Sequence, residues 1–174
     1  MVEKDGKLKV ICCADTSSCC RPVQDDKSQR RTIERCQGTD TSLDEAIAEV
    51  SQVLKATNIN VVVNKINVTS KEQAEALQFE SSPTIRVNGR DIQLEIRESL
   101  CESCGDLCGD EVDCRVWVFQ GQEYTSPPKA MIIEAILREV YGSPEKQERG
   151  KKVYQLPDNL KKFFESMHEK QKAV

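Results

Sequence analysis

Apolar residues follow a helical period in some stretches of the chain and a strand-like pattern in the segments between them. Residues 42–57 place apolar side chains three and four positions apart, and Ser42 with Glu45 forms a capping box, so we predict a helix that begins at Ser42. Residues 59–68, INVVVNKINV, predict a strand that is buried on both sides if its neighbours are helices. Residues 70–79 predict a short helix capped by Ser70.

Strand patterns occupy much of the remaining chain. Residues 8–12 predict a strand that leads directly into a cysteine-rich loop. Residues 82–96 predict two strands joined by a hairpin turn at Asn88-Gly89, and residues 115–125 predict a further strand with a turn at Gly121. Residues 126–142 predict a helix that has Pro127 and Pro128 in its first turn and stops at Gly142. We therefore place the end of the folded domain at residue 142.

The C-terminal part of the chain differs from the domain in its pattern of charged and apolar residues. Residues 143–155 form a charged linker, and residues 156–174 predict an amphipathic helix. The apolar side of this helix either packs back on the domain or docks into a partner protein. Its apolar residues are Leu156, Leu160, Phe163, Phe164 and Met167.

Composition limits the class of protein. The chain has 174 residues, of which 38% are hydrophobic and 31% charged, and its net charge is -4. These values are typical of a globular domain and exclude a general nucleic-acid binder, which would carry a basic surface. No apolar run reaches the roughly 20 residues that cross a bilayer, and no secretion signal is visible, so we expect a cytoplasmic protein without a membrane partner.

Nine cysteines make sulfur chemistry the leading expectation. Because cytosolic thiols stay reduced, clustered cysteines there indicate metal binding or redox chemistry more than structural disulfides. The first group follows the first predicted strand and ends close to the first predicted helix. A helix start and nearby arginines lower a thiol pKa, which favours Cys36 and Cys20 as reactive thiols. The candidate catalytic cysteines are Cys12, Cys13, Cys19, Cys20 and Cys36.

A second cysteine group occupies residues 101–114, CESCGDLCGDEVDC. Glycines follow two of its cysteines, as in metal-binding knuckles, and four thiolates in so short a segment can surround a tetrahedral Zn²⁺. Zinc is the first choice, with redox-active disulfides and buried thiols without a ligand as the alternatives. An iron-sulfur cluster or another soft metal fits less well. The predicted ligands are Cys101, Cys104, Cys108 and Cys114.

The order of the predicted elements combines a βαβ unit with a ββα unit, and in this the chain resembles thioredoxin-like proteins. The segment Ser82-Pro83-Thr84 stands at the start of the third strand. Proteins of that fold carry a proline there, usually in the cis form and beside the active cysteines. The resemblance therefore implies an α/β fold of thioredoxin-like type over residues 1–142, with residues 101–114 as a cysteine-rich insert, and adds Pro83 to the candidate site.

The resemblance extends to an uncharacterised microbial family of small thioredoxin-like proteins, known as a domain of unknown function. Three segments carry it: ERCQGTDTSLDEAI, SSPTIRVNGRDI and CESCGDLCGDEVDCRVWVFQGQEYTSPPKAMIIEAIL. Members of this family carry Cys-x-x-Cys before the first helix. Here Cys36 matches the second cysteine and Ile33 replaces the first, so one of Cys12, Cys13, Cys19 and Cys20 would have to supply the missing thiol.

Three functions follow from these observations. The first is thiol-disulfide exchange with a protein or small-molecule disulfide. The second is binding of zinc or of a soft ion such as Hg²⁺, As(III) or Cu(I) without catalysis. The third is an adaptor in which zinc stabilises the fold and the C-terminal helix recruits a partner. The sequence alone leaves all three open, with thiol-disulfide exchange slightly favoured.

Overall fold

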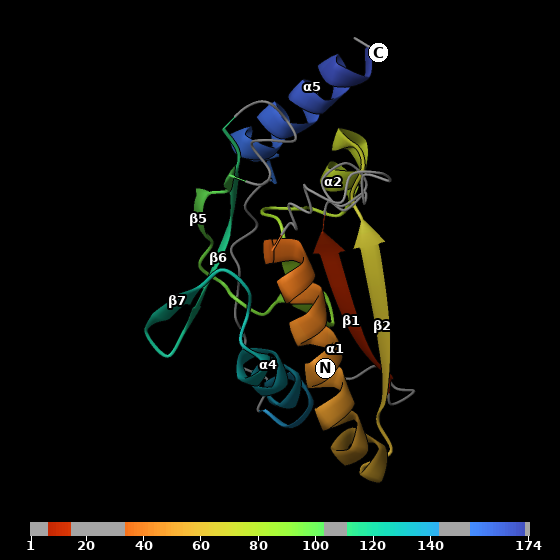
Figure 1. Ribbon diagram of the computed structural model, residues 1–174. Helices are drawn as coiled ribbons and strands as arrows, with labels where there is room; N and C mark the ends of the chain where they lie inside the picture. Colours follow the sequence, from red (N-terminus) through yellow and green to blue (C-terminus); the bar gives the residue numbers. More distant parts are fainter. Residues whose placement is uncertain (1–6, 15–33, 103–110, 143–153, 173–174) are drawn as a thin grey trace, which may run out of the picture.

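The computed structural model describes residues 7–14, 34–102, 111–142 and 154–172 and shows a mixed α/β architecture with two sheets (Figure 1). The larger sheet has the strand order β2-β1-β3-β4. Its parallel strands β1 (Lys7–Ala14) and β2 (Asn60–Asn67) flank helix α1 (Glu34–Ala56) in the sequence. Strand β3 (Thr84–Val87) is antiparallel to β1, and β4 (Arg90–Asp91) is antiparallel to β3.

Helix α1 begins at Glu34, whereas the capping pattern predicted a start at Ser42. That boundary was wrong because packing outweighs the weak helix propensity of the residues between Gly38 and Thr41. Gly38 lies so close to Ser126 that an added Cβ would overlap the Ser126 hydroxyl. Thr39 is fully buried, and its hydroxyl donates to the carbonyl oxygen of Arg35 at 2.7 Å. The turns of α1 that precede Ser42 therefore pack into the interior of the protein.

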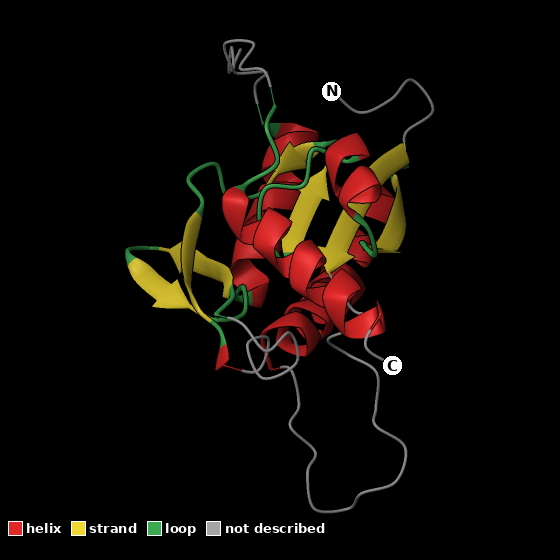
Figure 2. Cartoon of the chain, turned by 90° about the horizontal axis from the view of Figure 1, so that it is seen from above, coloured by secondary structure: helices red, strands yellow, loops and turns green. Residues whose placement is uncertain are grey.

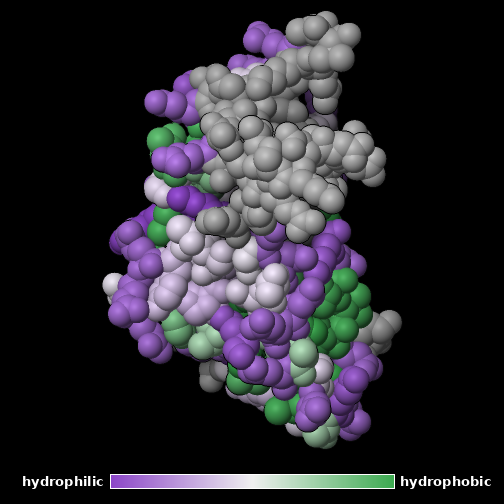
Figure 3. All heavy atoms as spheres, viewed as in Figure 1, coloured by the Kyte–Doolittle hydropathy of each residue, from purple (hydrophilic) through white to green (hydrophobic). Residues whose placement is uncertain are grey.

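The expectation that residues 59–68 are buried on both sides was also wrong. Among the described strands, β2 pairs only with β1, and its residues alternate between exposed and half-buried positions. Val61 and Val63 pack against the core under α1, while Val62 is 42% exposed. A hydrophobic patch lies over β2 on the surface (Figure 3).

The segment between β2 and β4 largely follows the sequence pattern. Helix α2 (Lys71–Ala76) is capped by Ser70, whose hydroxyl accepts the Gln73 N–H at 3.2 Å. The predicted hairpin turn is present, with positive φ angles at Asn88 and Gly89. The second strand of this hairpin is shorter than predicted, because the chain turns toward the second sheet. There the Gln93 side chain accepts the Val118 N–H and donates to the Val116 carbonyl oxygen.

The second sheet has the strand order β5-β6-β7. It consists of β5 (Arg97–Leu100), β6 (Asp113–Phe119) and β7 (Gln122–Tyr124), all antiparallel. Strand β5 was not predicted, since RESL shows no apolar alternation. The turn at Gly121 is as predicted, with positive φ at Gln120 and Gly121. Both views show the β6–β7 hairpin projecting from the body of the protein (Figure 1, Figure 2).

In the part of the chain that the structure describes, two hydrophobic clusters hold these elements together. The larger joins α1, β3, Trp117 and helix α4 (Lys129–Tyr141) and contains Leu43, Ile85 and Ile132. The smaller joins Val68, α2 and Phe79 to Leu156 and to Leu160 of helix α5 (Asp158–Lys172), so the apolar side of α5 packs within the chain. Within the described ranges, no helix combines the length and the apolar character that crossing a bilayer requires.

Candidate functional site

Strand β1 ends, α1 begins and β3 begins at the same end of the larger sheet (Figure 1). The peptide bond between Ser82 and Pro83 is cis and directly precedes β3. In the register of the sheet, Cys13 pairs with Thr84 and Cys12 with Ile85. The backbone of the predicted Cys12-Cys13 pair therefore lies on the strand next to Pro83, although these two cysteines are 70 positions or more from Pro83 in sequence.

Cys36 occupies the first turn of α1 and is 4% exposed. Its neighbour Arg35 fixes this turn against the second sheet. The Arg35 guanidinium donates through Nη1 to the carbonyl oxygens of Ser99 at 3.2 Å and Cys114 at 3.1 Å. Through Nη2 it donates to the Ser99 hydroxyl at 3.0 Å and to the Leu100 carbonyl oxygen at 3.1 Å. Arg35 thus joins the helix that carries Cys36 to the strand that carries Cys114.

Arg115 links the second sheet to the loop at Pro83. Its backbone N–H donates to the Ser82 carbonyl oxygen at 2.7 Å, and its Nη1 donates to the Thr84 hydroxyl at 3.0 Å. The fully buried guanidinium forms a two-pronged ion pair with Asp91, with N···O distances of 3.0 and 2.9 Å, and stacks 4.6 Å above the Trp117 ring. Nη2 of Arg115 also donates to the Gln93 carbonyl oxygen at 3.1 Å, whereas the buried Nε has no hydrogen-bond partner among the described residues. A buried pair of this kind depends on such additional acceptors.

This Arg115–Asp91 pair was missed in the sequence because its partners are 24 residues apart and belong to different sheets. Arg115 was assigned to a strand only, and no local pattern marks a charged residue as buried. The side chain of Trp117, below the guanidinium, is fully buried.

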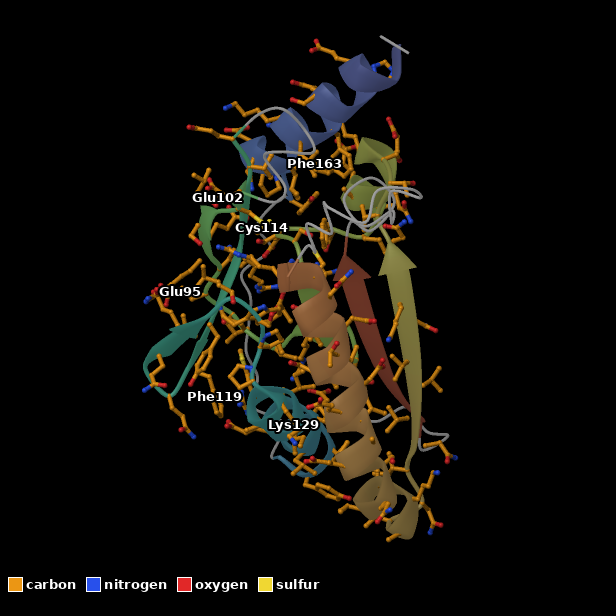
Figure 4. All side chains as sticks on the ribbon, viewed as in Figure 1. Glu95, Glu102, Cys114, Phe119, Lys129 and Phe163 are labelled. Atoms are coloured by element: carbon orange, nitrogen blue, oxygen red, sulfur yellow. The ribbon has the colours of Figure 1, made fainter. Side chains whose placement is uncertain are left out.

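The C-terminal segment also reaches the edge of the site. The side-chain amide of Asn159 donates to the Asp113 carbonyl oxygen at 2.8 Å and accepts the Asp113 N–H at 3.2 Å, directly before Cys114. The Tyr154 hydroxyl donates to the Phe79 carbonyl oxygen at 2.7 Å. Burial raises the pKa of Tyr154 above its usual value, and the carboxylates of Glu80 and Glu75 raise it further. Figure 4 shows Cys114 between the start of α1 and Phe163 of α5.

The described cysteines are brought to this region from distant parts of the chain. Cys36 at 4%, Cys101 at 4% and Cys114 at 2% exposure are all buried. Cys19, Cys20, Cys104 and Cys108 lie outside the described residues, so the predicted four-cysteine zinc site remains a prediction. Within the part of the chain that the structure describes, no group of three or more His, Cys, Asp or Glu residues is arranged to hold a metal ion.

Comparison with known protein families gives a match over most of the chain. A family model described as Domain of unknown function (DUF2703) matches residues 24–136, which is more than half of the chain. The matched range includes Cys36, Pro83 and all four cysteines of the second group. No curated protein and no solved structure is significantly similar to the chain.

Proposed function

The chain belongs to the DUF2703 family, a domain of unknown function, and we propose that it is a thioredoxin-like thiol-disulfide exchange protein. The observation that carries this proposal is the juxtaposition of Cys13, Pro83 and the start of α1 at one end of the sheet. The proposal takes residues 101–114 as a cysteine-rich insert between β5 and β6. It requires a reducing compartment such as the cytoplasm.

The arrangement of the larger sheet supports a thioredoxin-like fold. Parallel β1 and β2 flank α1, and antiparallel β3 and β4 are followed later by α4, which packs against α1. The cis peptide bond before Pro83 stands where that fold carries its proline. Since many folds support several functions, this likeness supports the proposal without deciding the chemistry.

The burial of Cys36 assigns it the role of the resolving thiol in this proposal. An attacking thiol must reach a disulfide in another molecule, whereas a resolving thiol attacks a bond already formed within the protein. Cys36 is buried in the first turn of α1, where the partial positive charge of the helix favours a thiolate. The attacking thiol then comes from Cys12, Cys13, Cys19 or Cys20, and the register of β1 favours Cys13.

The exchange proceeds in two balanced steps. The attacking thiolate forms a bond to one sulfur of the substrate disulfide and releases the other as a thiolate. Cys36 thiolate then attacks the protein sulfur of this mixed disulfide and releases the second substrate thiolate. Two electrons pass from the protein to the substrate, the protein keeps a disulfide, and a small dithiol reductant restores it.

The test is the reduction of a model disulfide by the full chain, which is first reduced with dithiothreitol and then freed of it, because free dithiothreitol would itself cleave a mixed disulfide. Cys36→Ser should abolish release of the second substrate thiol and trap the mixed disulfide, which mass spectrometry of the intact protein detects as an added substrate mass. Gln37→Ser changes an exposed residue of the same helical turn and serves as the matched control, with release of the second thiol unchanged. Release of the second thiol by the Cys36→Ser variant at the rate of the unmodified chain would exclude this mechanism.

Zinc or soft-metal binding without catalysis is the second candidate. The observation that favours it is the burial of Cys101 and Cys114, since thiols shielded from solvent suit a bound ion better than attack on an external disulfide. The same assay separates the two candidates. A metal-binding protein without exchange activity would form no mixed disulfide in the Cys36→Ser variant.

A further inference from the structure

Helix α5 lies between the second sheet and the smaller hydrophobic cluster, and it presents a different side to each. Asn159 and Phe163 are four positions apart and therefore lie on one side of the helix. Asn159 binds the backbone of Asp113 in β6, and Phe163 is buried. Leu160 and Phe164 lie on the neighbouring side and pack in the smaller cluster with α2. Helix α5 therefore joins β6 to α2.

The Asn159 amide holds the edge of β6 as a neighbouring strand would. Its Nδ2 donates to the Asp113 carbonyl oxygen at 2.8 Å, and its Oδ1 accepts the Asp113 N–H at 3.2 Å. Two positions further along the same strand, the Arg115 N–H donates to the Ser82 carbonyl oxygen at 2.7 Å. Cys114 thus lies between two backbone attachment points, one made by α5 and the other by the loop before β3.

The C-terminal segment is also attached to the chain that leads to this loop. The Tyr154 hydroxyl donates to the Phe79 carbonyl oxygen at 2.7 Å. Glu98 of β5 accepts the Ser81 hydroxyl at 2.7 Å, and the same carboxylate oxygen lies 3.5 Å from the Asn159 amide nitrogen. Residues 154–172 therefore contact β5, β6 and the segment before β3, which surround Cys114.

The strength of these attachments is limited. Most of them are hydrogen bonds at exposed or half-buried positions, and the apolar anchor is the smaller cluster, which includes Leu156 and Leu160. Segments held in this way open at a lower free energy than the rest of a fold. Cys114 is 2% exposed and lies between the start of α1 and Phe163 (Figure 4). Opening of α5 would remove one side of its surroundings.

We propose that residues 154–172 form a strap that keeps the Cys114 thiol buried and opens while the larger cluster stays folded. When the strap is docked, Cys114 is shielded from reagents in solution. When it is open, the thiol becomes available to a disulfide or a metal ion. The strap acts whichever chemistry the thiols perform, so a lack of disulfide exchange and a lack of strap opening are separate results.

The rate at which Cys114 is alkylated measures this opening on the full chain, reduced and then freed of reductant. A short pulse of iodoacetamide labels the accessible thiols, and an isotopically heavy form labels the remainder after unfolding. A protease that cuts after Asp and Glu then releases Cys114 on peptide 114–123, which contains no other cysteine. The ratio of light to heavy label, measured by mass spectrometry, gives the rate. The assay contains neither a substrate disulfide nor a metal ion.

Two variants weaken different attachments of the strap. Asn159→Ala removes two hydrogen bonds to β6 and should speed alkylation of Cys114 by about tenfold. Leu160→Ala removes a buried anchor in the smaller cluster and should speed it by a factor on the order of one hundred. Gln155→Ala removes an exposed side-chain amide of the same segment and is the matched control, with the rate unchanged.

Hydrogen exchange of the same variants separates opening of the strap from unfolding of the whole molecule. Exchange in β3 and α4 should stay nearly unchanged, because both belong to the larger cluster. A Cys114 rate in both variants equal to that of the unmodified chain would overturn the proposal. So would an equally large acceleration of exchange in β3, since Cys114 would then become accessible only when the entire fold opens.

Discussion

At the scale of single residues, the buried ion pair between Arg115 and Asp91 is the contact that ties the second sheet to the start of β3. The Arg115 backbone N–H also donates to the Ser82 carbonyl oxygen, and its side chain donates to the Thr84 hydroxyl. Arg115 therefore contacts the loop before β3, β3 itself and, through Asp91, β4. When one partner of such a buried pair is removed, the other charge stays buried without compensation, and the free energy of unfolding falls.

We predict that Asp91→Ala lowers the free energy of unfolding by about 3–5 kcal/mol, because it leaves the Arg115 guanidinium buried without its carboxylate. Urea unfolding followed by circular dichroism measures the change. Glu134→Ala removes the exposed pair with Arg138 and should change stability by less than about 1 kcal/mol. Replacing both partners, as in Asp91→Ala/Arg115→Met, should recover part of the loss. Equal effects of Asp91→Ala and Glu134→Ala would contradict this account.

At the scale of elements, the first turns of α1 show how packing extends a helix beyond its sequence signals. Gly38 is a poor helix residue in isolation, and alanine at an open helical position would stabilise by about 1 kcal/mol. Here the Ser126 side chain occupies the place that a Cβ would take.

We therefore predict that Gly38→Ala destabilises the protein by about 1–3 kcal/mol, the usual cost of forcing extra atoms into a packed contact. Gly38→Ala/Ser126→Gly should recover most of this loss, because the second change removes the side chain that meets the new methyl group. Thermal unfolding of the two variants measures both effects. A Gly38→Ala variant more stable than the unmodified chain would contradict this account, because it would show that Ser126 can move away from the new methyl group without loss of stability.

The elements that could be predicted are those with a strong local pattern. Helix α2 with its Ser70 cap and the turns at Asn88-Gly89 and Gly121 agree with the sequence. The start of α1 and the existence of β5 could not be predicted, because both depend on contacts made by distant residues. The hydrogen bonds of Arg35 to Ser99 and Leu100 span more than 60 positions. The same holds for the candidate site. The sequence indicated nearby arginines such as Arg35 only as positive charges close to Cys36, and it gave no indication of the contacts of Arg35 with Ser99 and Cys114 or of the burial of Arg115.

At the scale of the whole molecule, the two hydrophobic clusters differ in size. Counted over the residues that the structure describes, the cluster under α1 and α4 contains ten buried residues, whereas the cluster that joins α2 and α5 contains five. Regions with fewer buried apolar contacts open at lower free energy, so the smaller cluster should open as a separate unit.

We predict that hydrogen exchange of α2 and α5 amides proceeds through openings of lower free energy than exchange in α1 and β3. Leu160→Ala removes a buried side chain of the smaller cluster and should lower the protection of α2 and α5, leaving β3 nearly unchanged. Lys162→Ala changes an exposed residue of the same helix and serves as the control. Hydrogen exchange measured by mass spectrometry follows each segment. An equal loss of protection in β3 would show that the molecule opens as one unit.

The position of β2 has a consequence for the behaviour of the protein at high concentration. Its exposed Val62 lies on a strand that pairs on one side only among the described strands. Such strands can template the addition of further chains, and natural proteins discourage this with polar and charged side chains. In β2, Asn60, Asn64 and Lys65 flank the three valines. These polar residues discourage the addition of further chains, and replacing them with apolar residues should increase aggregation at high concentration.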